Sequence, residues 1–192
     1  MLFALHSQLH LETATAALTG ASVLMAITIS RDEGLLAKVF SKIEWLAIFF
    51  FAGLFILVGA LVETGVIAML AREAMQVTNG DVSATAMLIL WMSAIASAFI
   101  DNIPFVATMI PMIKEMSTMG LTNLEPLWWS LSLGACLGGN GTLVGASANV
   151  VVASMAAQKG HQLSFVKYLL IGFPMMIISI IISSIYIYFW HL

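Results

Sequence analysis

AFIDNIPFVATMIP, residues 98–111, interrupts a strongly apolar region with Asp101 and Asn102 and places Pro104 two positions later. The nearest charged residues along the chain are Asp81 and Lys114, so Asp101 stands apart from other charges. A charged aspartate at the middle of a bilayer costs roughly 2.5 to 3.5 kcal/mol on insertion scales, and such residues are paired, hydrated or protonatable. The stretch therefore indicates a polar interruption with a function.

The composition around this stretch is that of a membrane protein. Of the 192 residues, 61% are hydrophobic and 9% are charged, and the mean hydropathy is +1.03, whereas a soluble domain has about a quarter charged residues. The net charge of −3 is scattered, which gives no basic field for nucleic acid. Cys136 is the only cysteine and excludes an internal disulfide. We expect an all-α integral membrane protein whose main partner is the lipid bilayer, with no nucleic acid partner.

Apolar segments along the chain predict one membrane domain over residues 1–192. Residues 11–64 hold two apolar stretches, each near the roughly 20 residues that a membrane-spanning helix needs. Residues 65–83 resemble a surface helix followed by a loop. Residues 167–190 form a last span with aromatic residues near its end, as in interfacial belts. The first two spans are expected to belong to a scaffold.

Two regions depart from this pattern of plain spans. Within residues 84–117, the residues DNI interrupt the apolar sequence, and the second arm reaches only about half of a bilayer before Lys114. Within residues 127–157, Asn140 and three glycines break a long apolar segment, and clustered glycine disfavours helix. We predict a re-entrant helical hairpin in the first region and a broken transmembrane helix in the second.

The basic residues favour a hairpin over a single crossing. If residues 84–117 return to their own side, residues 31–44 and 158–167 share one side, and Arg72 and Lys114 lie on the other. The shared side is then cytoplasmic by the positive-inside rule, and a single crossing would erase the bias. Two full crossings give the same parity, and only the short second arm argues against them. The basic residues of the shared side are Arg31, Lys38, Lys42, Lys159 and Lys167.

Irregular backbone at bilayer depth survives only inside protein or beside a wet cavity, so both breaks must face something polar. Pro104 suits the first position of a half-helix, which places Asp101 and Asn102 at a positive helix end. Discontinuous helices of this kind mark the ion and substrate sites of secondary transporters. The expected cation-binding residues are Ser97, Asp101, Asn102, Gly139, Asn140 and Thr142, with Na⁺ at Asp101, Asn102 and Asn140, and the expected substrate-binding residues are Asn102, Thr142 and Asn149.

Other interpretations of the same residues stay open. Gly134-x₃-Gly138 and Gly141-x₃-Gly145 are small-residue patterns that also serve helix packing, so the chain could be a non-transporting accessory or structural subunit. An intramembrane aspartyl protease needs two carboxylates that share a proton, and Asp101 has no second deep acid. The four histidines lie near segment ends, away from the serines that a hydrolase would use. The sequence therefore predicts no enzyme.

Three blocks of sequence resemble a known family. EWLAIFFFAGLFILVGALVETG, SAFIDNIPFVATMIPMI and WSLSLGACLGGNGTLVGASANVVVASMA are similar to the arsenite permease and P-protein branch of the ion transporter superfamily, also described as citrate transporter-like. The resemblance implies a fold of two inverted repeats, each with a re-entrant hairpin and a broken helix. It also implies a dimer formed through the scaffold, and transport of anions with Na⁺ or H⁺ or exchange of Na⁺ for H⁺.

The resemblance also bears on single residues. Asp101-Asn102-Ile103 falls where the dicarboxylate symporters of the superfamily carry a Ser-Asn-Thr hairpin tip that binds Na⁺ and a carboxylate, so only Asn102 is kept. Asp101 and Ile103 replace the flanking hydroxyls and disfavour a dicarboxylate at this position. Asn140 to Thr142 match the helix break that completes the cation site.

The chain resembles only one repeat, because no second copy of the DNIP or GGNG pattern is found. We expect the C-terminal half of a secondary active transporter that moves an anion, an oxyanion or an organic acid with Na⁺ or H⁺ and uses no other cofactor. The alternative is half of a Na⁺/H⁺ antiporter. An N-terminal half from another chain is the expected partner, and the prokaryotic inner membrane the expected location.

Overall fold

The computed structural model describes residues 12–29 and 35–192, and these residues form helices and turns with no strand. The all-α membrane fold that the sequence predicts is thus confirmed. Of the described helices, two are long and apolar enough to cross a membrane, Trp45–Glu63 and Phe165–Trp190. The chain divides into two compact units, residues 1–51 and residues 52–192.

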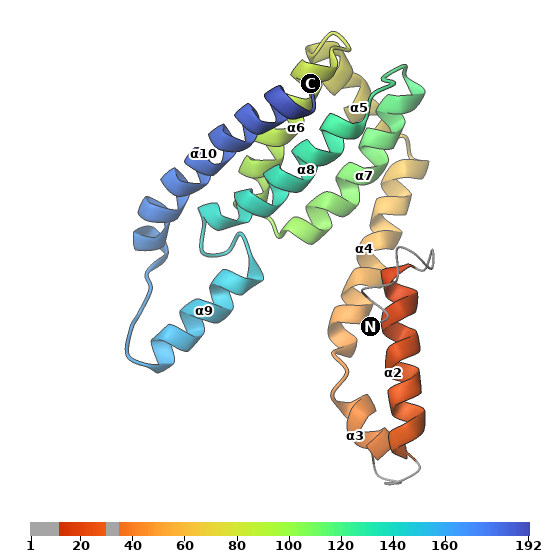
Figure 1. Ribbon diagram of the computed structural model, residues 1–192, viewed down its shortest axis with the longest axis vertical. Helices are drawn as coiled ribbons and strands as arrows, with labels where there is room; N and C mark the ends of the chain where they lie inside the picture. The colour runs from red at the N-terminus through yellow and green to blue at the C-terminus, as the bar shows by residue number, and fades with distance from the viewer. Residues whose placement is uncertain (1–11, 30–34) are drawn as a thin grey trace. The chain divides into compact units, whose positions relative to one another are not determined.

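The first unit contains α2 (Thr13–Ile29), α3 (Leu35–Ser41) and the beginning of α4 (Trp45–Glu63) (Figure 1). Helix α2 has 17 residues, the lower end of what a membrane-spanning helix needs. After α3, the Trp45 indole N–H donates to the Phe40 carbonyl at 3.2 Å, and the two rings stack with centroids 6.4 Å apart. Arg31, on which part of the charge argument rests, lies outside the described residues.

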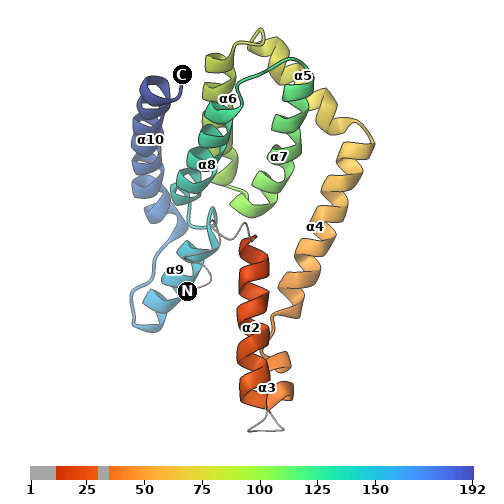
Figure 2. The same ribbon diagram turned by 45° about the vertical axis from the view of Figure 1, so that its right-hand side comes forward.

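The second unit is built around the antiparallel pair α6 (Val82–Ser97) and α7 (Asn102–Thr118). Helix α6 runs toward the turn at residues 98–101 and α7 runs back (Figure 2). Helix α8 (Glu125–Gly138) then runs parallel to α6, and α10 (Phe165–Trp190) runs antiparallel to both. Between α8 and α10 lie the short 3₁₀ helix η1 (Gly139–Gly141) and α9 (Ser147–Gln158), which buries none of its residues.

Helix α5 (Val66–Val77) lies before this bundle and meets α6 at a bend of 120°. Its polar residues Arg72 and Glu73 are exposed, whereas Ile67 and Ala71 are 2% and 0% exposed and belong to the face that packs on α7. The segment that the sequence assigns to the surface is therefore an amphipathic helix with one buried stripe. An apolar cavity of about 350 Å³ lies between α5, α6 and α7.

Two details of the hairpin differ from the sequence prediction. Helix α7 continues through Lys114 to Thr118 and has 17 residues, about 25 Å, because lysine is a good helix former and can extend its ammonium away from apolar surroundings. The second arm is therefore as long as the first, and its length no longer distinguishes a re-entrant hairpin from two crossings. The helix also begins at Asn102, since Asp101 is its N-cap, which makes Pro104 the third helical residue rather than the first.

Helices α6 and α8 pack closely because small residues face each other. A Cβ on Gly134 would lie 2.5 Å from the Leu90 carbonyl oxygen, and one on Gly138 would collide with the Ala94 backbone. The first small-residue pattern thus serves helix packing, and it fixes α6 and α8 side by side up to the residues where both end.

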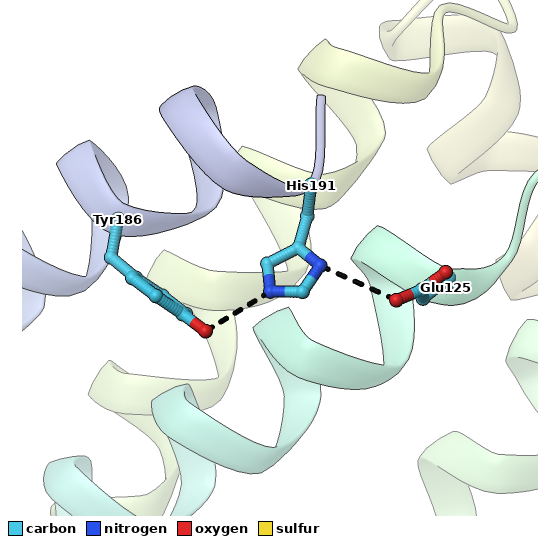
Figure 3. A network of polar contacts seen from close by, with 3 residues as sticks. All are labelled: Glu125, Tyr186 and His191. Carbon is cyan, nitrogen blue, oxygen red and sulfur yellow. Dashed lines mark hydrogen bonds and ion pairs between the residues drawn. The ribbon is translucent and has the colours of Figure 1, made fainter.

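A polar cluster joins α8 to α10 at the ends of these helices that lie away from the two breaks. His191 lies 3.4 Å from Glu125 through Nδ1 and 3.3 Å from the Tyr186 hydroxyl through Nε2 (Figure 3). The His191 ring also stacks on Trp129 with centroids 5.1 Å apart. This cluster holds the beginning of α8 against the end of α10, far along both helices from the two breaks.

Candidate functional site

The candidate site lies where α6 and α8 end side by side and the two interrupted regions touch. Helices α6 and α8 are parallel, so their carboxyl ends lie together, and α7 and α9 begin directly after the two breaks. Carboxyl ends of helices carry partial negative charge and amino ends partial positive charge, each about half an elementary charge. The same small region therefore offers carbonyl oxygens for a cation and backbone N–H groups for an anion.

Two hydrogen bonds between residues far apart in the sequence join the end of α6 and its turn to the end of α8 and its break. The Ser97 hydroxyl donates to the Ala135 carbonyl at 2.6 Å, and the Thr142 hydroxyl donates to the Ala98 carbonyl. Both hydroxyl groups belong to residues with 0% exposure. The structure therefore brings together Ser97 and Thr142, two of the residues that the sequence selects.

Gly145 is a residue of this contact that the sequence analysis placed only in a packing pattern. A Cβ there would lie 2.8 Å from the carbonyl oxygens of both Ala98 and Gly139, and 2.9 Å from that of Ser97. Three carbonyl oxygens, two from the end of α6 and one from η1, thus converge on one point beside the glycine. Only glycine permits this approach, and the position of Gly145 in a Gly-x₃-Gly pattern was the signal for it in the sequence.

Asn149 completes the break from the beginning of α9. Its side-chain nitrogen donates to the Gly139 carbonyl at 3.0 Å and to the Thr142 carbonyl at 3.1 Å. Because both neighbours are acceptors, the amide must present its nitrogen to them. The Asn149 side chain therefore satisfies carbonyl groups that the broken helix leaves without backbone donors.

Three predicted polar residues, two at the hairpin tip and one in the helix break, have fewer hydrogen-bond partners. Asp101 is half-buried, and its Oδ1 accepts from the Ile103 N–H at 3.1 Å. In the described part of the chain no basic side chain forms an ion pair with it. Asn102 is half-buried and Asn140 is exposed, and within residues 12–29 and 35–192 neither side chain forms a hydrogen bond of its own. Asn140 lies beside α10, since a Cβ on Gly172 would be 2.8 Å from the Asn140 backbone carbonyl oxygen, whereas Asn102 lines a hollow with Phe55 and Val106. Among the described residues no hydrogen bond or ion pair joins Asp101, Asn102 and Asn140 to one another.

A multidentate site for a transition metal is not found in the described segments, since no three His, Cys, Asp or Glu side chains gather there. Carbonyl, amide and single carboxylate oxygens are hard ligands and suit Na⁺ or a proton better than such metals. The chemistry that these oxygen atoms offer is reversible binding of small, hard cations.

Comparison with known proteins gives a family model and several curated relatives. The family model described as "Citrate transporter" matches residues 1–134. An "Uncharacterized transporter" of Mycobacterium bovis is 44% identical over 97% of this chain and 43% of its own length. The "46 kDa membrane protein" of Mycobacterium leprae is 40% identical over 99% and 44%, and the "P protein" of Homo sapiens is 39% identical over 95% and 22%.

The chain spans less than half the length of these curated relatives. No solved structure matches the chain. The family match covers the hairpin and most of α8, and the relatives extend over the helix break as well. The chain belongs to the citrate transporter family of the ion transporter superfamily.

Proposed function

We propose that the chain is the C-terminal half of a secondary active transporter that couples an anion, an oxyanion or an organic acid to Na⁺ or H⁺. The observation that carries the proposal is that α6 and α8 end side by side at the two breaks. Buried hydrogen bonds run from Ser97 to Ala135 between the two helices and from Thr142 to Ala98 between the two breaks, and α7 and α9 begin after these breaks. A cation among Asp101, Asn102 and Asn140 would draw these ends together. The solute would then take the N–H groups at the beginning of α7 and α9.

Each residue of the proposed site has a role that follows from its surroundings. Asp101 supplies the negative charge, and Asn102 and Asn140 supply amide oxygens to the cation and amide N–H groups to the solute. Ser97, Gly139 and Thr142 surround the cation from the helix ends, and Asn149 borders the substrate side. The hairpin and the broken helix would move together against the scaffold to change the side from which the site is open.

Exchange of Na⁺ for H⁺ is the second candidate, and Asp101 favours it. A carboxylate that can take either a proton or Na⁺ needs no solute, and Asp101 stands where the dicarboxylate symporters of the superfamily have a hydroxyl. The proposal also includes an N-terminal half from another chain, dimerisation through the scaffold and the prokaryotic inner membrane. The length of the relatives supports the missing half.

Flux in proteoliposomes tests the proposal. The chain alone, and the chain together with a candidate N-terminal half, are assayed with radiolabelled Na⁺ and with an internal pH dye, under imposed Na⁺ and pH gradients. We expect Na⁺-dependent or pH-dependent flux when the site is complete. A non-transporting subunit would instead show no flux in either preparation, and if a complete transporter is formed with it, Asp101→Asn and Asn140→Ala would leave that flux unchanged.

A further inference from the structure

The Thr142 side chain forms two hydrogen bonds at the helix break. Its hydroxyl donates to the Ala98 carbonyl of the hairpin turn and accepts from the Gly145 N–H at 3.0 Å. A hydroxyl has one proton and two lone pairs, so the donor and one acceptor position are already used. The residue is 0% exposed. One lone pair of this oxygen remains, but the side chain is buried, so a cation would have to enter a packed contact to reach it.

The neighbouring polar side chains also form hydrogen bonds to the backbone. Ser97 donates to Ala135 across the α6–α8 contact, and the Asn149 amide nitrogen bridges the carbonyl groups of Gly139 and Thr142. All these donors go to backbone carbonyl groups at the ends of helices. By contrast, Asn102 and Asn140 form no side-chain hydrogen bond in the described residues.

We infer that Thr142 is a positioning residue for the ion site and not one of its ligands. It ties the hairpin turn to the helix break, and Asn149 holds the break in the shape that Thr142 requires. Asp101, Asn102 and Asn140 then contact the ion, and Thr142 acts on it through the Ala98 and Gly145 backbone. This inference rests on the proposed transport function for its ion-affinity part, and on the hydrogen bonds alone for its structural part.

The first test is the exchange of Thr142 for valine, which has the same shape without the hydroxyl. Valine leaves the Ala98 carbonyl without its donor, and it leaves the Gly145 N–H with only the Thr142 carbonyl, at 3.3 Å, as an acceptor. The loss of a buried hydrogen bond of this kind changes an equilibrium constant by about tenfold or more. We expect hydrogen exchange at Gly145 to become about tenfold faster or more, and the Na⁺ concentration for half-maximal flux to rise by a similar factor. Thr142→Ser should restore both values.

The matched control is Thr108→Val in α7. The Thr108 hydroxyl donates at 3.0 Å to the Pro104 carbonyl of its own helix and joins no two elements. The Thr108→Val variant should leave hydrogen exchange at Gly145 and the Na⁺ dependence of flux at wild-type values. An equal effect of both valine variants would overturn the inference, because a general loss of stability would then explain them.

An engineered disulfide distinguishes a positioning role of Thr142 from a role as an ion ligand. A Cβ on Gly141 would lie 3.3 Å from the Cβ of Ala98, close to the roughly 3.5 to 4.5 Å of bonded cysteine pairs. In a Cys136→Ser background, Ala98→Cys with Gly141→Cys should cross-link the hairpin turn to the break directly beside Thr142. We expect the oxidised cross-link to restore the Na⁺ dependence of Thr142→Val, and reduction to abolish the rescue.

Three results would overturn the inference. They are unchanged Gly145 exchange in Thr142→Val, failure of the cysteine pair to cross-link with Thr142 in place, and a cross-linked Thr142→Val protein that keeps the weakened Na⁺ dependence. The last result would identify the hydroxyl as a ligand. Absence of ion-dependent flux in the wild type would instead overturn the proposed function, and hydrogen exchange would still decide whether Thr142 ties the two breaks.

Discussion

At the scale of single residues, Asp101 has a local role in the structure and a second role in the proposed mechanism. It is the N-cap of α7, and its Oδ1 accepts from Ile103. Asparagine is an equally good N-cap, so a cap alone does not require a charge. In the proposed mechanism the charge of the carboxylate is what the ion requires, and no basic side chain in the described residues forms an ion pair with it.

Asp101→Asn separates these two uses. The variant keeps the cap and removes the charge, so we expect the melting temperature in detergent to change little. Na⁺-dependent flux should fall about tenfold or more, because interactions with charged groups are worth roughly 1.5 to 3 kcal/mol. Asp81→Asn is the matched control, since Asp81 caps α6 by accepting from Ala84 at 2.7 Å. Equal flux in wild type and Asp101→Asn would remove the charge from the mechanism.

At the scale of elements, the parallel contact of α6 and α8 positions the site. Both helices end at the breaks, and small residues let their backbones approach each other along their length. A large side chain in this contact separates the helix ends as well as the helices. The position of the carbonyl groups therefore depends on residues that never touch an ion.

Gly138→Leu tests this dependence. The added side chain meets the Ala94 backbone, and overpacking of this kind costs about 1 to 3 kcal/mol or more. We expect a lower melting temperature and a smaller monodisperse fraction in detergent. Gly53→Leu is the control, because nothing lies within 4 Å of a Cβ at that position. A Gly138→Leu protein as stable as Gly53→Leu would contradict the close packing of α6 on α8.

The sequence was sufficient to predict helices, apolar character and the location of the polar interruptions, because these depend on local composition. It could not predict the parallel pairing of α6 and α8 or the bond between Thr142 and Ala98, which joins residues 44 positions apart. The length of α7 was underestimated, since Lys114 was treated as an end although a lysine can continue a helix. The contact of His191 with Glu125 could not be predicted either, because the two residues lie far apart in the sequence.

At the scale of the whole molecule, the antiparallel course of α6 and α7 determines which loops share a side of the membrane. Helix α5 ends where α6 begins, and the loop before α8 follows the end of α7. The loop between α9 and α10 lies beyond the break. A hairpin, re-entrant or full, thus puts residues 76 and 123 on one side and residue 162 on the other.

Cysteine labelling in right-side-out vesicles tests this topology. Gln76, Asn123 and Gln162 are exposed, and each is changed to cysteine in a Cys136→Ser background. We expect an impermeant maleimide to label positions 76 and 123 from outside, and position 162 only after the membrane is opened. Labelling of positions 76 and 123 from opposite sides would show a single crossing and would end the hairpin model.

The parallel pairing of α6 and α8 also has a consequence for biosynthesis. Ala98 leaves the ribosome 44 residues before its partner Thr142, a delay of roughly 2 to 9 s at typical elongation rates of about 5 to 20 residues per second. During this interval the small-residue face of α6 has α7 but not α8 as a neighbour. Nascent chains that stall within this window would present that small-residue face to other helices in the bilayer.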